Sequence, residues 1–292
     1  MQDLEYFRPR QLDEAIAILA EKGERAIPLA GGTNLMVRLK RGRLNASCLV
    51  DVKAIPDLRG IDSNGETLRI GALVTQTELA GSAIIRAQAP VLARACRMMA
   101  YPEIRNRGTI GGNVCNAGRA ADLIPPLIAL GSALHLASPS GQRVLPVADF
   151  LLGAGRTALI PGELLVSIEV PRHGPDTACA YVRVSTRRTA GVAAASAAVF
   201  LAAEGGLCRE ARIVLGALES KPRLSVEAAG LLVGKALDEE VVDAAARLAI
   251  EGVSVVRDAR ISAEYRLHMA RLAIKQALEE AWTEVNSKCA TS

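Results

Sequence analysis

The sequence predicts an α+β protein with at least two structural units. Half of the 292 residues are hydrophobic, so the chain can bury a sizeable core and form about two domains. Near the N-terminus, short apolar runs alternate with a helical pattern, which is typical of a βαβ unit. After residue 176, three strand-like runs precede three helical segments. The polar, turn-rich segment 172–176 lies between these two patterns, and we expect a domain boundary there.

The N-terminal part begins with a helical pattern. Leu12, Ile16 and Leu19 recur at helical spacing, which predicts one apolar helix face. A βαβ unit follows, formed in order by a strand, a glycine turn, a short helix and a second strand: 26–29, 30–34, 35–40 and 48–52. We expect Val50 and Val52 to lie in the core of its sheet.

The rest of the chain can be assigned in the same way. Thr75 and Glu78 have the spacing of a capping box, which predicts a helix start. Between residues 56 and 174 we expect a strand, a helix, a hairpin and another strand: 68–73, 90–100, 134–137 with 143–145, and 164–170. After the boundary we expect three strands and then three helices: 180–184, 191–203, 211–218, 226–233, 239–251 and 261–282.

Composition argues against several classes of protein. The net charge of +4 is mild and aromatic residues are few, which argues against nucleic-acid binding. The longest small and apolar run, 190–203, is too short to cross a bilayer, and the N-terminus lacks the pattern of a signal peptide. The six cysteines include no CxxC pair, so we expect no metal site and a reducing, cytoplasmic location.

Two glycine-containing loops are the most informative feature of the chain. Ala30–Asn34 reads AGGTN and Thr109–Asn113 reads TIGGN. A single Gly-Gly pair is most often an ordinary turn, but each of these lies between an apolar run and an expected helix or turn. Glycine allows close backbone approach, and backbone N–H groups in such loops bind phosphates. The pair of loops therefore predicts a long ligand with a diphosphate at its centre.

These residues also carry a family resemblance. The segments LAGGT (29–33), IRNRGTIGGN (104–113) and AADL (120–123) resemble the FAD-binding medium subunit of the molybdenum hydroxylases, the xanthine and carbon monoxide dehydrogenase type. The similarity runs from Tyr6 to Arg266. It implies a PCMH-type FAD-binding domain, 1–174, made of two α/β subdomains, about 1–55 and 56–174. A C-terminal α+β domain with an antiparallel sheet, 175–285, and a tail, 286–292, would follow.

The resemblance implies FAD as the cofactor and assigns residues to it. The implied cofactor-binding residues are Ile27, Pro28, Leu29, Ala30, Gly31, Gly32, Thr33, Asn34, Thr109, Ile110, Gly111, Gly112, Asn113, Asp122, Leu165 and Arg183. Backbone groups of both loops would hold the diphosphate, and Asp122 would bind cofactor hydroxyls. Asp122 could instead cap the helix that follows it, and Leu165 is equally well explained as strand core. No residue is assigned to catalysis or to a metal.

Three positions depart from the family pattern. Asn34 stands where aspartate is usual, Arg119 where proline is usual, and Arg183 where lysine is usual. Asn34 removes one negative charge, Arg119 gives a looser and more basic turn, and the planar guanidinium of Arg183 has a different geometry. These departures leave the diphosphate loops in place and bear on the placement and potential of the flavin.

The resemblance implies an oxidoreductase subunit that transfers electrons. Two [2Fe–2S] clusters of a small subunit would pass electrons to FAD, and NAD⁺ or another acceptor would receive them. A molybdopterin-binding large subunit would complete a heterotrimer. Two alternatives are a stand-alone flavoprotein oxidoreductase and a non-catalytic nucleotide-binding scaffold. The substrate, the physiological acceptor and the number of complex copies are left open by the sequence.

Overall fold

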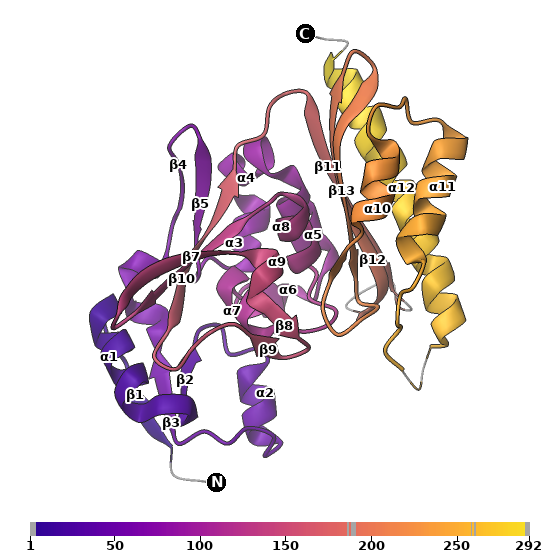
Figure 1. Ribbon diagram of the computed structural model, residues 1–292. Coiled ribbons are helices and arrows are strands. Elements are labelled where there is room, and N and C mark those ends of the chain that lie inside the picture. Colours follow the sequence, from indigo (N-terminus) through magenta and orange to yellow (C-terminus); the bar gives the residue numbers. More distant parts are fainter. Residues whose placement is uncertain (1–3, 186, 188–190, 258, 260, 290–292) are drawn as a thin grey trace.

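Three main sheets with their helices follow one another along the chain (Figure 1). The computed structural model describes residues 4–185, 187, 191–257, 259 and 261–289. The α+β class expected from the sequence is confirmed, because a parallel sheet, a helix-rich antiparallel unit and a helix-covered antiparallel sheet are all present. Among the described residues, no helix combines the length and apolar character that a membrane crossing requires.

The first sheet contains the expected βαβ unit. Its strands, in the order β1-β3-β2, are all parallel: β1 (Glu5–Phe7), β2 (Ala26–Leu29) and β3 (Cys48–Asp51). Two helices accompany them, α1 (Leu12–Lys22) and α2 (Leu35–Lys40). Val50 lies in the sheet core as expected, but Val52 begins a short 3₁₀ turn, Val52–Ala54, and is buried there.

The middle unit has a five-stranded antiparallel sheet. Its order is β4-β5-β10-β6-β7, with bounds β4 (Ile61–Ser63), β5 (Thr67–Gly71), β6 (Ala133–Ser138), β7 (Gly141–Pro146) and β10 (Leu164–Pro171). The expected hairpin is β6–β7, and the capping box of Thr75 and Glu78 is present at the start of α3. Around the sheet lie α3 (Gln76–Gly81), α4 (Ala83–Gln88), α5 (Pro90–Met98), α6 (Pro102–Arg105), α7 (Ile110–Asn116), α8 (Ile124–Ala129), α9 (Val147–Phe150) and the small pair β8 (Leu151–Gly153) and β9 (Arg156–Thr157).

The third sheet is antiparallel and carries three helices on its outer face (Figure 1). Its elements are β11 (Thr177–Ser185), β12 (Ala193–Glu204), β13 (Leu207–Gly216), β14 (Arg223–Leu224), α10 (Val226–Leu232), α11 (Glu239–Ile250) and α12 (Ala263–Cys289). The expected helix 261–282 therefore continues into the segment 286–292 that we expected as a tail. Residues 290–292 lie outside the described part of the chain.

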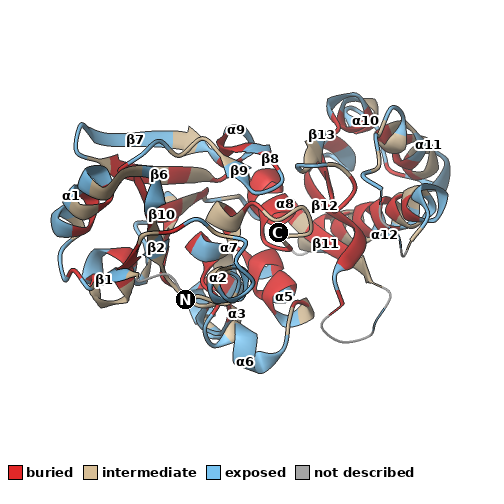
Figure 2. Ribbon diagram, turned by 90° about the horizontal axis from the view of Figure 1, so that it is seen from below, coloured by how far each residue is buried: buried red, intermediate tan, exposed pale blue. Residues whose placement is uncertain are grey.

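The central strand β12 is covered on both faces (Figure 2). Ala198, Phe200 and Ala202 pack into the core of the middle unit, whereas Val199 and Leu201 pack against the C-terminal helices. Alternate residues of a strand point to opposite faces, so a strand covered twice reads as a continuous apolar run. This packing places β11 beside α5, and Arg183 near its end bonds Asp122 and the carbonyl of Met98.

Candidate functional site

A cavity of about 630 Å³ lies where the first and middle units meet, and the β11–β12 end closes one side of it. This volume is in the range typical of sites for small molecules and cofactors. The structure brings fourteen of the sixteen expected site residues to this cavity: Ile27, Pro28, Ala30, Gly31, Gly32, Thr33, Asn34, Thr109, Gly111, Gly112, Asn113, Asp122, Leu165 and Arg183. Leu29 and Ile110 do not line it, and Ile110 is fully buried in the core of the middle unit.

The first glycine loop offers free backbone donors. Gly32 has a φ of +73°, and the carbonyls of Gly32 and Asn34 accept bonds from the following helix α2. Within the described part of the chain, no residue accepts a hydrogen bond from the N–H groups of residues 31–34. Consecutive free N–H groups next to a left-handed glycine form an anion-binding concavity. This loop therefore suits a diphosphate.

The two loops contact each other directly through Gly31. A Cβ built on Gly31 would lie 1.9 Å from the carbonyl oxygen of Arg107, on the segment that enters the second loop. A Cβ on Gly111 would lie 2.7 Å from both Cβ and the carbonyl oxygen of Ala72. We expected a side chain at Gly32 or Gly111 to intrude where the backbone approaches the diphosphate. In the structure, packing within the protein already excludes a side chain at Gly31 and Gly111.

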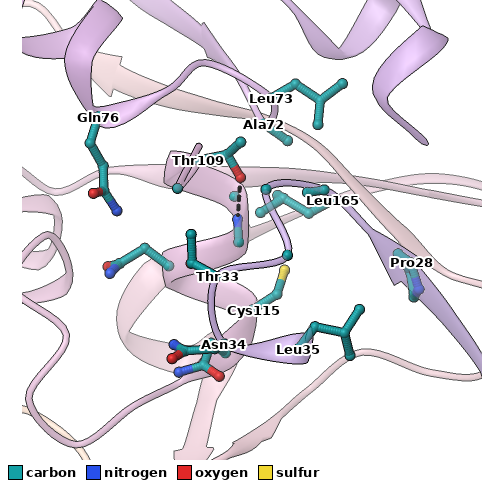
Figure 3. Close-up of a pocket in the computed structure, with 18 of the residues that line it drawn as sticks. Pro28, Thr33, Asn34, Leu35, Ala72, Leu73, Gln76, Thr109, Cys115 and Leu165 are labelled. Atoms are coloured by element: carbon teal, nitrogen blue, oxygen red, sulfur yellow. Dashed lines mark hydrogen bonds between the residues drawn. The ribbon is translucent and has the colours of Figure 1, made fainter. Parts of the chain in front are cut away.

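The second loop has a different role from the first, because the backbone N–H groups of residues 110–113 already have acceptors within the chain. The N–H of Ile110 donates to Val74, that of Gly111 to Ala72, and that of Gly112 to the Thr109 hydroxyl, at 2.9 Å each. Thr109 thereby caps α7, as Figure 3 shows. A ligand at this loop would therefore meet the side chains of Thr109 and Asn113, whereas the N–H groups of residues 110–113, which we expected to be free, are already bonded.

Asp122 belongs to a buried hydrogen-bonded cluster at the edge of the cavity. Its carboxylate accepts a bond from the Tyr181 hydroxyl at 2.8 Å and an ion-paired bond from Arg183 Nε at 2.7 Å. Burial raises the pKa of Asp122, while Arg183 and Tyr181 act in the opposite direction. Arg183 also donates to the carbonyl of Gly191 and so ties β11 to the start of β12. The helix-cap alternative is not what the structure shows, because α8 has Leu123 at its N-cap and no side-chain cap.

Apolar side chains form another wall of the cavity. Leu165, in β10, is 3% exposed and belongs to the core of the middle unit, as one interpretation expected; it also lines the cavity, so its contact with a cofactor stays a prediction. Val52, Leu58, Leu73 and Leu164 line the cavity and belong to one buried cluster that joins the first and middle units. Such a wall suits a flat, weakly polar ring.

Several lining residues were not expected from the sequence: Leu35, Arg38, Gln76, Met99, Ala100, Ile104, Cys115, Asn116, Leu159, Glu163 and Val192 among them. Arg38 lies in α2, four residues after Asn34, so helical spacing could have placed it on the same side as the first loop. Met99 belongs to the core of the middle unit as well as to the cavity lining. Gln76 stands within a capping box, and no sequence signal singled it out. Cys115 also lines the cavity (Figure 3), and burial raises the pKa of its thiol to about 12.

The residues present fit a dinucleotide cofactor. The first loop supplies free N–H donors for a diphosphate, and the apolar wall supplies a surface for a ring. In addition, the amide oxygens of Gln76 and Asn113 are buried without a partner in the described structure, and both residues line the cavity. Such orphaned polar atoms are rare in folded proteins and indicate a missing bonding partner.

Comparison with known proteins gives a consistent assignment. Residues 2–173 match the family model described as the FAD binding domain in molybdopterin dehydrogenase, and residues 180–281 match the CO dehydrogenase flavoprotein C-terminal domain. The carbon monoxide dehydrogenase medium chain of Afipia carboxidovorans is 38% identical over 95% of this chain and 96% of its own length. A putative xanthine dehydrogenase FAD-binding subunit of Escherichia coli is 28% identical over 97% of both chains.

A solved structure agrees with the sequence relatives. A chain of the reconstituted CO dehydrogenase from Oligotropha carboxidovorans superimposes with a TM-score of 0.93 at 37% identity. The match covers 97% of this chain and 98% of the other.

Proposed function

This chain belongs to the FAD-binding medium subunits of the molybdenum hydroxylase family, and from that premise we propose that it is the electron-transfer subunit of such a complex. It is a subunit of an oxidoreductase and its cofactor is FAD. In our proposal the chain passes electrons from two [2Fe–2S] clusters of a partner subunit through its FAD to NAD⁺ or another acceptor. The observation that carries the proposal is the cavity with its free N–H loop, two orphaned amides and buried ion pair.

Each group of cavity residues has a separate task in this proposal. The N–H groups of residues 31–34 hold the diphosphate, and Arg38 adds positive charge at the same side. The apolar wall around Leu165 excludes water from a ring. Asp122 and Arg183 fix the β11–β12 end against the middle unit and present polar atoms to the cofactor. The bound flavin supplies the redox chemistry, and the chain supplies binding, orientation and access.

The domain assignment and the partners are also proposed. We assign residues 1–174 to the FAD-binding domain and 175–285 to the C-terminal domain. We assign the oxidation of the substrate to a molybdopterin-binding large subunit, and the two clusters to a small subunit, in a cytoplasmic heterotrimer. Relatives named for carbon monoxide and for xanthine resemble this chain along almost their whole length. The substrate specificity therefore belongs to another chain.

Isolation of the complex through a tag on this chain tests the proposal. We expect FAD, iron and molybdenum to purify together in a fixed ratio, and we expect a substrate to reduce the clusters before the flavin. Turnover of an organic substrate by the isolated chain would instead identify a stand-alone oxidoreductase. A colourless chain that stays colourless after addition of flavin would identify a scaffold.

A further inference from the structure

Two buried amide oxygens in the cavity have no hydrogen-bond partner. Among the described side chains, only Gln76 Oε1, Asn113 Oδ1 and Ser132 Oγ are buried polar atoms without one. Two of these three residues line the same cavity. Leaving a buried polar atom unpaired is unfavourable, and native structures contain few such atoms. The clustering therefore points to a partner that is not part of this chain.

Gln76 lies where the start of α3 meets the 107–108 segment, which in turn packs on the first glycine loop. It is the first residue of α3, is 5% exposed, and donates its backbone N–H to Gly108 at 2.9 Å. Its side-chain Nε2 lies so close to Gly108 that a Cβ there would come within 2.9 Å of it. Gly108 is next to Arg107, whose carbonyl packs on Gly31 of the first loop. The carboxamide is thus held beside both loops by packing, as Figure 3 illustrates.

The polar character of Gln76 has no structural explanation within the chain. The start of α3 is stabilised by the capping box, in which Thr75 and Glu78 bond each other's backbone N–H groups. The Gln76 side chain takes no part in it. An apolar side chain of similar size would fill the same space without an unpaired oxygen. Its amide is therefore explained by a ligand and not by the fold.

We propose that Gln76 is a cofactor-binding residue whose carboxamide hydrogen-bonds FAD, with Asn113 of α7 as its counterpart on the second loop. A carboxamide carries both a donor and an acceptor, and FAD presents phosphate oxygens, hydroxyl groups and a ring edge to either. The proposal rests on FAD as the cofactor and is independent of the direction of electron flow.

The test compares Gln76→Leu with Gln88→Leu in the full chain after removal of flavin. Gln88 ends α4 and lies outside the cavity lining, and its amide oxygen accepts a bond from the Ser63 hydroxyl, so it serves as a control glutamine. We expect Gln76→Leu to weaken FAD binding by about 2- to 13-fold, the range for one neutral hydrogen bond. The Tm of the flavin-free chain should stay the same or rise, because a buried unpaired oxygen is removed. Gln88→Leu should bind FAD like the wild type.

Titrations with FMN and with ADP then show which half of the cofactor Gln76 contacts. Weaker FMN binding assigns the contact to the flavin half, and weaker ADP binding assigns it to the adenosine half; either result supports the proposal. Unchanged affinity for all three ligands would overturn it, as would a fall in Tm without loss of affinity. These measurements use no partner subunit, so they can fail while the proposed electron transfer stands, and the reverse also holds.

Discussion

Replacement of Asp122 by alanine should destabilise the chain itself as well as its complex with FAD. The Asp122 and Arg183 side chains are only 8% and 7% exposed and are joined by a 2.7 Å bond. In Asp122→Ala the guanidinium keeps its bonds to the carbonyls of Met98 and Gly191 but has lost its ion-pair partner. Removing one member of a buried ion pair costs about 3–5 kcal/mol. For domains of 150–250 residues each kcal/mol corresponds to about 2–4 °C, so Tm should fall by about 6–20 °C.

A double-mutant cycle separates the ion pair from general damage to the site. Arg183→Met alone leaves the carboxylate without its cation, and the double variant removes both charges. We expect the double variant to be more stable than the sum of the single changes predicts, with a coupling of about 1–3 kcal/mol. Glu284→Ala, which breaks an exposed pair with Lys288 in α12, is the matched control and should cost only about 0.3–0.5 kcal/mol.

Urea denaturation of the flavin-free chain and fluorescence titration with FAD measure the two effects of the Asp122 change. Because Arg183 lines the cavity, Asp122→Ala should also weaken FAD binding, by about tenfold or more if one charge-assisted bond is lost. Additive single changes, or an Asp122→Ala chain with wild-type stability and affinity, would refute the structural reasoning.

Three further predictions follow from particular contacts. Gly31→Ala should abolish FAD retention, because the new Cβ would meet the Arg107 carbonyl oxygen at 1.9 Å. The control Gly81→Ala, whose Cβ would have no atom within 4 Å, should stabilise α3 by about 0.4–1 kcal/mol. Flavin absorbance measures the retained FAD, and calorimetry measures the stability of each variant. Burial lowers the pKa of His173, so the folded chain binds that proton less readily than the unfolded chain, and the free energy of unfolding should decrease as pH falls below about 6.5. His173→Gln should flatten this dependence in urea titrations, and an unchanged slope would contradict it. Burial raises the pKa of Cys115 to about 12, which disfavours the thiolate that a covalent flavin bond would need. Acid precipitation should therefore release the flavin, and Cys115→Ala should retain FAD before acid treatment.

Most regular elements could be predicted from the sequence because their signals are local. The helical spacing of Leu12, Ile16 and Leu19 gave α1, and the long alanine-rich run gave the doubly covered strand β12. Short elements such as β1 and α6 were missed, since three or four residues carry too little periodicity. The second glycine loop was expected to be a turn-like cradle, but Thr109 caps a helix there.

The sequence predicted where the candidate site lies, but it did not predict the contacts that hold the site together. Motif resemblance located fourteen lining residues, but it did not show that Gly31 and Gly111 are required by packing against Arg107 and Ala72. These contacts join segments that are far apart in the sequence, so no local pattern reports them. The same holds for the pairing of Asp122 with Arg183, 61 residues later, and for the orphaned amide of Gln76.

Electron flow through the flavin of this chain is the central claim, and removal of FAD from the assembled complex tests it most directly. Dithionite or the substrate of the complex should still reduce the iron–sulfur clusters, which electron paramagnetic resonance detects. Reduction of NAD⁺, or of whichever acceptor the native complex uses, should be lost and should return when FAD is added back. An acceptor that is reduced at the same rate with and without FAD would contradict the account.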